Sequence, residues 1–108
     1  MSQPRPRELR HVVLFAFKET TTPTQLEAVE QAFAALPPEI AEIKGFEWGT
    51  DVSVEHLADG YTHCFLVTFE SLPDRDTYLV HPAHRAFVAG IQPHVAKALV
   101  IDYWAGRR

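Results

Sequence analysis

Two side chains between positions 61 and 87 are suited to moving protons, a tyrosine at position 78 and a histidine at position 84. Because histidine has an ordinary pKa of about 6.5, a neutral His84 can take a proton from a carbon acid or a hydroxyl near neutral pH. Tyr78 can donate its hydroxyl proton to a carbonyl oxygen on which enolate charge builds, and a donor placed in this way typically lowers the barrier by about 3 kcal/mol. The pair is therefore a candidate for acid and base chemistry on a carbonyl compound.

Three further polar residues are expected near this pair, namely His11, His63 and Asp102. The first and last predicted strands are antiparallel neighbours, so Asp102 is expected opposite His11, where it can accept a hydrogen bond from the imidazole and fix its tautomer. His63 alternates with apolar residues on one strand face and is expected to project to the same side. We expect one pocket for an apolar, aromatic or chain-like ligand, lined also by Val13, Phe33, Trp48, Phe65 and Phe87.

Each of these residues also has a purely structural interpretation. His11 and His63 lie in alternating apolar strands, where hydrogen-bonded core histidines are about as common as functional ones. Tyr78 can equally be a core aromatic residue with its hydroxyl at the rim of the core. We expect His81 to lie in solvent beside the helix break that Pro82 imposes.

A metal site built from His11, His63 and His84 is a weaker alternative, because no carboxylate accompanies these histidines at a helical ligand spacing. The aromatic content does not distinguish a haem or flavin pocket from ordinary core packing. We therefore expect no metal and no cofactor.

The elements that must position these residues follow the order βαββαβ. Alternating apolar residues predict strands at 9–18, 43–54, 61–70 and 97–104. Helical spacing begins after the Thr22-Pro23 capping signal and ends at Pro37-Pro38, and a second helical segment from Leu72 is broken at Pro82. This order predicts an α+β fold, a ferredoxin-like sandwich in which both helical segments cover one face of a four-stranded antiparallel sheet.

The predicted strands carry apolar residues on both faces, although the helices cover only one. The uncovered face is expected to hold Val12, Leu14, Cys64 and Leu66. An apolar sheet face of several hundred Å² is rarely left to water. We therefore expect this face to pack against a second copy of the chain in a symmetric homodimer.

Composition restricts the remaining function classes. The chain has 108 residues, 46% of them hydrophobic, which suits one domain with one core. Its ten Lys and Arg residues are dispersed and the net charge is −4, so we expect no nucleic-acid partner. The single cysteine favours a reducing, cytoplasmic setting. The longest apolar run, residues 12–17, is too short to cross a membrane, and no signal-peptide pattern is present, so no membrane association is expected.

Several short motifs resemble the stress-responsive dimeric A/B barrel (Dabb) family. The resemblance extends from about Leu9 to Trp104, and we expect a domain at 9–104 between a flexible N-terminal tail (1–8) and a C-terminal tail (105–108). The motifs that carry it are GYTH (60–63), TFES (68–71), Tyr78 followed by HPAH (81–84) and Phe87, His11 near the start, and Asp102-Tyr103 near the end.

The resemblance implies a ferredoxin-like protomer that dimerises into an α/β barrel. One branch of the family consists of plant polyketide cyclases, which close a linear polyketide by aldol condensation without a cofactor, with a tyrosine and a histidine as the catalytic pair. By motif match these roles correspond to Tyr78 and His84, and His11 and His63 correspond to positions that line the pocket.

The leading hypothesis is thus a homodimeric barrel protein with a small apolar pocket that carries out cofactor-free, aldol-type acid and base catalysis on a polyketide-like or aromatic substrate. A non-catalytic ligand-binding protein or a stress-related structural oligomer is the first alternative. A cofactor-independent monooxygenase is the second, by analogy of fold alone. The sequence patterns leave open whether the protein is an enzyme.

Overall fold

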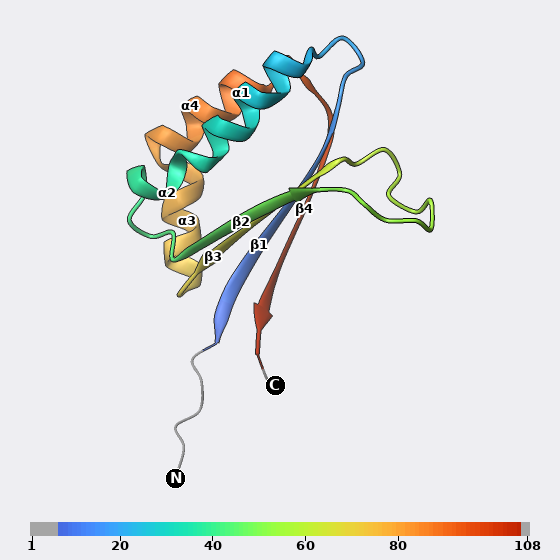
Figure 1. The fold of residues 1–108 in the computed structure, drawn as a ribbon. Helices are drawn as coiled ribbons and strands as arrows, with labels where there is room; N and C mark the ends of the chain where they lie inside the picture. The colour runs from blue at the N-terminus through green and yellow to red at the C-terminus, as the bar shows by residue number, and fades with distance from the viewer. Residues whose placement is uncertain (1–6, 107–108) are drawn as a thin grey trace.

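The structure contains the predicted sequence of elements, with one additional short helix. It is a computed structural model and describes residues 7–106 (Figure 1). The strands are β1 (Glu8–Phe17), β2 (Gly45–Thr50), β3 (His63–Phe69) and β4 (Val95–Ala105). The helices are α1 (Pro23–Ala34), α2 (Leu36–Glu39), α3 (Leu72–Val80) and α4 (Pro82–Ile91).

The strands form one antiparallel sheet in the order β2-β3-β1-β4, and the helices lie together on one of its faces (Figure 1). This arrangement confirms the ferredoxin-like α+β fold. The central strand β1 pairs with β3 on one side and with β4 on the other. The order matters for the site, because it separates β3 and β2 from the β4 edge.

Local capping signals explain where the helices begin. The hydroxyl of Thr22 accepts a hydrogen bond from the Gln25 N–H, and the Gln25 side chain accepts one from the Thr22 N–H, which completes a capping box at α1. Ser71 caps α3 in a similar way by accepting a hydrogen bond from the Asp74 N–H.

Several boundaries differ from the sequence prediction, and strand β3 is shorter than the predicted range 61–70. Pro37 and Pro38 do not end the helical segment but lie near the start of α2, where a missing backbone N–H costs nothing. Strand β2 occupies only the middle of the predicted range 43–54, and β4 begins at Val95 rather than at Lys97.

Of the predicted tails, Glu8 belongs to β1 and Ala105 to β4, while residues 1–6 and 107–108 lie outside the described residues.

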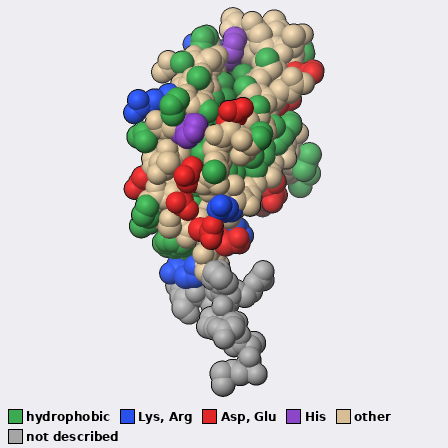
Figure 2. All heavy atoms as spheres, turned by 90° about the vertical axis from the view of Figure 1, so that its left-hand side faces the viewer, with side chains coloured by type: hydrophobic (Ala, Val, Ile, Leu, Met, Phe, Trp, Pro, Cys, Tyr) green, Lys and Arg blue, Asp and Glu red, His purple; other side chains and the backbone are tan. Residues whose placement is uncertain are grey.

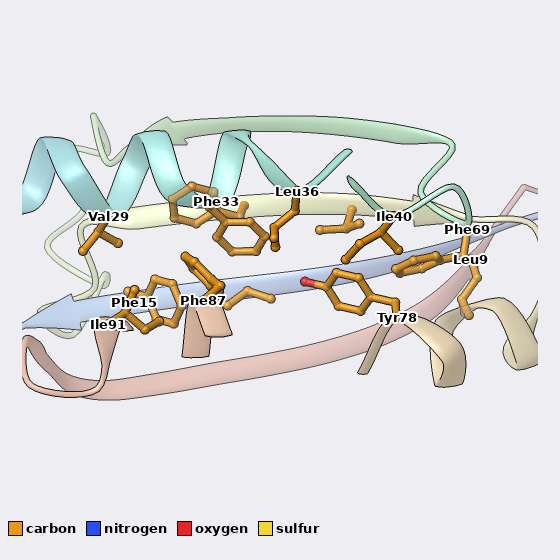
Figure 3. Packing of buried hydrophobic residues seen from close by; sticks show 13 residues of the cluster. Leu9, Phe15, Val29, Phe33, Leu36, Ile40, Phe69, Tyr78, Phe87 and Ile91 are labelled. Atoms are coloured by element: carbon orange, nitrogen blue, oxygen red, sulfur yellow. The ribbon is translucent and has the colours of Figure 1, made fainter. Parts of the chain in front are cut away.

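The core lies between the sheet and the helix layer (Figure 3). The rings of Phe33 from α1 and Phe65 from β3 stack with their centroids 4.3 Å apart, and Phe87 of α4 lies 4.6 Å from Phe33. Aromatic pairs at these separations add to the stabilisation that area burial alone provides. This cluster fixes α1 and α4 over the sheet.

The opposite face of the sheet is apolar and open. Leu99, Ile101 and Tyr103 of β4 are about half exposed there, beside the partly buried Val12 and Leu14 of β1. The helix side has a different surface, on which acidic, basic and apolar side chains are interspersed (Figure 2). None of the helices within residues 7–106 combines the length and the apolar character that crossing a membrane requires.

Candidate active site

A cavity of about 400 Å³ lies between the β1 and β4 part of the sheet and the helices α3 and α4. Its lining is mainly apolar, and most of its polar side chains come from the end where β1 begins. The lining residues are His11, Val13, Phe15, Phe33, Tyr78, Leu79, His84, Phe87, Val88, Ile91, Gln92, Val95, Ala98, Val100 and Asp102. The cavity is thus an apolar site with a polar end.

His11 and Asp102 meet at that polar end. The β1–β4 register places the two residues opposite each other, and the His11 Nδ1 atom lies 2.7 Å from the Asp102 Oδ1 atom. The His11 ring is buried and the Asp102 side chain is 24% exposed. Because a carboxylate can only accept a hydrogen bond, the His11 Nδ1 atom carries the proton in this contact.

Arg75 of α3 completes this cluster, and sequence reasoning missed it. Its Nη1 atom donates to the Asp102 Oδ2 atom over 2.8 Å, while its Nε atom donates to Asp76 over 2.9 Å. These carboxylates raise the pKa of Arg75 further, with the hydrogen bond to Asp102 as the largest cause. The helical spacing of Arg75 and Tyr78 was the available signal, because residues three apart lie on the same side of a helix.

Tyr78 is fully buried, and its hydroxyl group has no hydrogen-bond partner among the described residues. Its ring lies 5.5 Å from the His11 ring and 4.4 Å from the His84 ring, measured between centroids. In Figure 3 the hydroxyl oxygen points along the core towards Phe87. Burial, with a smaller contribution from the Asp102 charge, raises the pKa of Tyr78 far above its usual value. The phenol therefore stays protonated and can act as a donor.

The surroundings of His84 favour the neutral form of its ring. Its Nδ1 atom lies 3.1 Å from the Leu79 carbonyl oxygen, so Nδ1–H donates to that oxygen and Nε2 keeps its lone pair. Burial, the largest cause, lowers the pKa of His84 against the opposing effect of the Leu79 carbonyl, and a positive charge on His11 or His81 would lower it further. A half-buried imidazole in this state can accept a proton near neutral pH.

The break between α3 and α4 sets the position of His84. Pro82 opens α4, and the preceding His81 caps it, because the His81 Nδ1 atom accepts a hydrogen bond from the Ala83 N–H over 3.0 Å. His81 is partly buried. The expectation that His81 lies in solvent is therefore corrected, since its ring satisfies one of the free N–H groups of the helix.

The structure does not bring His63, Trp48 and Phe65 to the cavity. They lie on the same sheet face as His11, but on β3 and the edge strand β2, with β1 between them and β4. Phe65 is fully buried in the core. The His63 Nε2 atom lies 2.8 Å from the Glu30 carboxylate and its Nδ1 atom 2.8 Å from the Thr62 hydroxyl. The expectation of a single pocket is thus corrected for these three residues.

The same separation argues against the metal alternative. Because His63 is held beside α1 while His11 and His84 face the cavity, the three imidazoles do not converge on one point. Within residues 7–106, no group of three or more His, Cys, Asp or Glu side chains is arranged to hold a metal ion.

The sequence and the fold have counterparts among known proteins. A stress-response A/B barrel domain-containing protein of Arabidopsis thaliana is 42% identical over 88% of this chain and 87% of its own length. Olivetolic acid cyclase of Cannabis sativa is 34% identical over 88% of this chain and 94% of its own length.

Solved structures agree with these relatives. A hydroxynitrile lyase of Passiflora edulis superimposes with a TM-score of 0.89 at 28% identity, covering 96% of this chain and 98% of its own. An Arabidopsis thaliana crystal structure gives a TM-score of 0.87 at 40% identity, covering 93% of this chain and 97% of its own. The family model of the stress responsive A/B barrel domain matches residues 9–105. The chain therefore belongs to the stress-responsive A/B barrel domain family.

Proposed function

We propose that this protein binds a small apolar carbonyl compound in the cavity and catalyses cofactor-free proton transfer on it, in an aldol-type cyclisation. The observation that carries the proposal is the Tyr78 hydroxyl group, which is buried, protonated and without a partner among the described residues. Leaving such a donor unpaired typically costs about 1–3 kcal/mol, so its presence beside an apolar cavity is best explained by a ligand acceptor.

The proposed step gives His84 and Tyr78 different tasks. The Nε2 atom of His84 removes a proton from the carbon next to a ligand carbonyl, and Tyr78 donates a hydrogen bond to the oxygen that becomes the enolate. The enolate carbon then forms a bond to a second carbonyl carbon of the same chain. The resulting alkoxide takes the proton back from His84, so the base is regenerated and no other reactant is needed.

Relatives support this reaction class. The olivetolic acid cyclase and the hydroxynitrile lyase are both similar to this chain over most of its length. The apolar side chains that line the cavity, among them Phe15 and Val100, suit a ligand with an alkyl or aryl end.

The direct test is turnover of a linear poly-β-ketone with an alkyl or aryl end, followed by mass spectrometry of the cyclised product. We expect His84→Gln and Tyr78→Phe each to lower kcat by about a hundredfold, whereas His94→Gln, a histidine outside the cavity, keeps the wild-type rate. Unchanged rates in both cavity variants would remove the catalytic proposal. Thermal stabilisation by the ketone without any turnover would favour a ligand-binding protein instead.

We also propose that the open sheet face joins two copies in a barrel-like homodimer, in a cytoplasmic setting. The face is apolar and contains a hollow of about 750 Å³ beside Leu14 and Leu99. A solved relative from Thermobifida fusca, 28% identical with a TM-score of 0.79, is described as a dimeric ferredoxin-like protein. A charge placed on the centre of such a face is costly to bury.

Analytical ultracentrifugation tests the dimer. We expect the wild-type chain to sediment as a dimer and Leu99→Glu to sediment as a monomer, because the new carboxylate would be desolvated without a partner. The matched control is Leu72→Glu, which adds the same charge at an exposed leucine on the helix side. A wild-type chain that stays monomeric at high concentration would contradict the proposal.

A further inference from the structure

We propose that Arg75 is a positioning residue of the cavity, which keeps His11 a neutral imidazole by occupying the second oxygen of Asp102. The inference rests on the proposed function only for its catalytic consequence, since the protonation state of His11 can be measured without turnover. Two short contacts carry it, and they form one chain from α3 through β4 to β1.

The Asp102 carboxylate is divided between two donors. Its Oδ2 atom accepts from the Arg75 Nη1 atom over 2.8 Å, and its Oδ1 atom accepts from the His11 Nδ1 atom over 2.7 Å. The Arg75 and Asp102 side chains are only 21% and 24% exposed, so water screens this ion pair weakly. Charge-assisted hydrogen bonds of this length are among the stronger polar contacts in proteins.

The Arg75 guanidinium partly neutralises the Asp102 carboxylate, and so weakens the attraction of that carboxylate for a second proton on His11. A buried carboxylate whose only partner is an imidazole favours the doubly protonated ring, since that ring supplies the opposite charge. Arg75 already supplies one positive charge to Asp102, so a second at His11 would give these three side chains a net positive charge. Only Asp76 offsets that charge, and its side chain is 64% exposed and screened by water. A proton on His11 would also be repelled by one on His84, whose pKa the His11 charge lowers.

Two of the other groups around the His11 ring carry no charge. Its β3 neighbour is the uncharged Val67, and Tyr78 is a neutral phenol. The titratable or charged side chains that face the cluster are Arg75, Asp76 and Tyr78 from α3, His81 and His84 from the α3–α4 junction and α4, and Asp102 from β4.

The consequence for the site is a fixed tautomer. With the proton on Nδ1 and no proton on Nε2, His11 presents an acceptor to the cavity next to the Tyr78 ring. It can then bind a hydroxyl or an enol of the ligand, or hold a proton that is passed along the cavity. A doubly protonated His11 would present a donor and a positive charge instead.

Nitrogen-15 NMR of the histidine side chains tests the inference directly, with the His11 signals assigned from the spectrum of His11→Gln. At neutral pH we expect the wild-type ring to be the Nδ1–H tautomer. In Arg75→Gln the ratio of doubly to singly protonated His11 should rise by about tenfold or more, as expected when one neighbouring unit charge is lost. Arg75→Lys should restore the wild-type spectrum because it keeps the charge.

Two controls separate positioning from folding. Arg85→Gln removes one positive charge from an exposed site on α4 that contributes nothing to the Asp102 contacts, and it should leave His11 unchanged. In an Asp102→Asn background, Arg75→Gln should no longer change the protonation of His11. This double variant also serves as the test if Arg75→Gln alone unfolds. The same His11 spectrum in wild type and a folded Arg75→Gln would overturn the inference, whatever the turnover assays show.

Discussion

Two buried histidines on the same sheet face each bind a carboxylate, yet their surroundings differ. His11 uses one ring nitrogen for Asp102 and directs its ring towards the cavity, whereas His63 uses both, one for Glu30 and one for the Thr62 hydroxyl. Trp48 and Phe17 also pack against the His63 ring, with centroids 6.1 Å and 5.0 Å away. A histidine with both nitrogens satisfied links elements, and one with a nitrogen left over is available for chemistry.

The largest expected difference between the two histidines is in turnover. We expect His11→Gln to lower kcat for a poly-β-ketone by roughly ten- to a hundredfold, because the acceptor beside Tyr78 is lost. His63→Gln should stay within about twofold of wild type below its unfolding temperature, since the ring does not line the cavity. Steady-state kinetics of the pair checks this, and an equal loss in both variants would contradict the division of roles.

The second expected difference is in stability. Glu30→Ala should lower the free energy of unfolding by about 1–3 kcal/mol, because it leaves the buried His63 Nε2–H without its acceptor. Glu27→Ala on the same helix is the matched control and should change it by less than about 0.5 kcal/mol, since within residues 7–106 Glu27 bonds only to the exposed Gln31. Urea unfolding measures both. Equal effects would mean that the His63 contact adds no stability.

A smaller change in the free energy of unfolding, with the opposite sign, is expected for Tyr78 at the cavity. Tyr78→Phe removes a buried hydroxyl that has no partner among the described residues, so the free energy of unfolding should stay equal or rise by up to about 1 kcal/mol. The same change should abolish most turnover. Thermal unfolding of the free protein provides the measurement, and a clear destabilisation would show that the hydroxyl has a partner in the folded chain.

The smallest effect concerns pH. Burial lowers the pKa of His84 in the folded state, so the unfolded chain binds the proton more tightly between that lowered value and the ordinary value of about 6.5. Stability from this group is therefore complete above the ordinary value and is lost as the pH falls through the window below it. Urea unfolding at several pH values, with His84→Gln as the control, should show a slope that the variant lacks.

Most of the fold could be predicted from the sequence, because strand alternation and the capping signal at Thr22 are local signals. The His11–Asp102 contact could also be anticipated, since it follows from the antiparallel pairing of β1 and β4. The position of His63 could not. Its face was evident from alternation, but its distance from the cavity depends on the strand order and on a long-range contact with Glu30.

Arg75 and His81 were missed for a related reason. A surface arginine on a helix is usually solvated, and its contact with Asp102, 27 positions further along the chain, depends on the tertiary fold. His81 appeared to be a solvent-exposed residue at a helix break, because histidine is a rare cap and its ring orientation is not visible in a sequence.

In the proposed function, the Tyr78 hydroxyl donates a hydrogen bond to a carbonyl oxygen of the ligand in the cavity. Infrared spectroscopy of a bound aryl alkyl ketone with a carbon-13 labelled carbonyl measures this directly. We expect the carbonyl stretching band to lie at lower frequency in the wild-type protein than in Tyr78→Phe, because a hydrogen bond to the oxygen weakens the carbonyl bond. The same band position in both proteins, with the ketone bound to each, would contradict a hydrogen bond from the Tyr78 hydroxyl to the ligand.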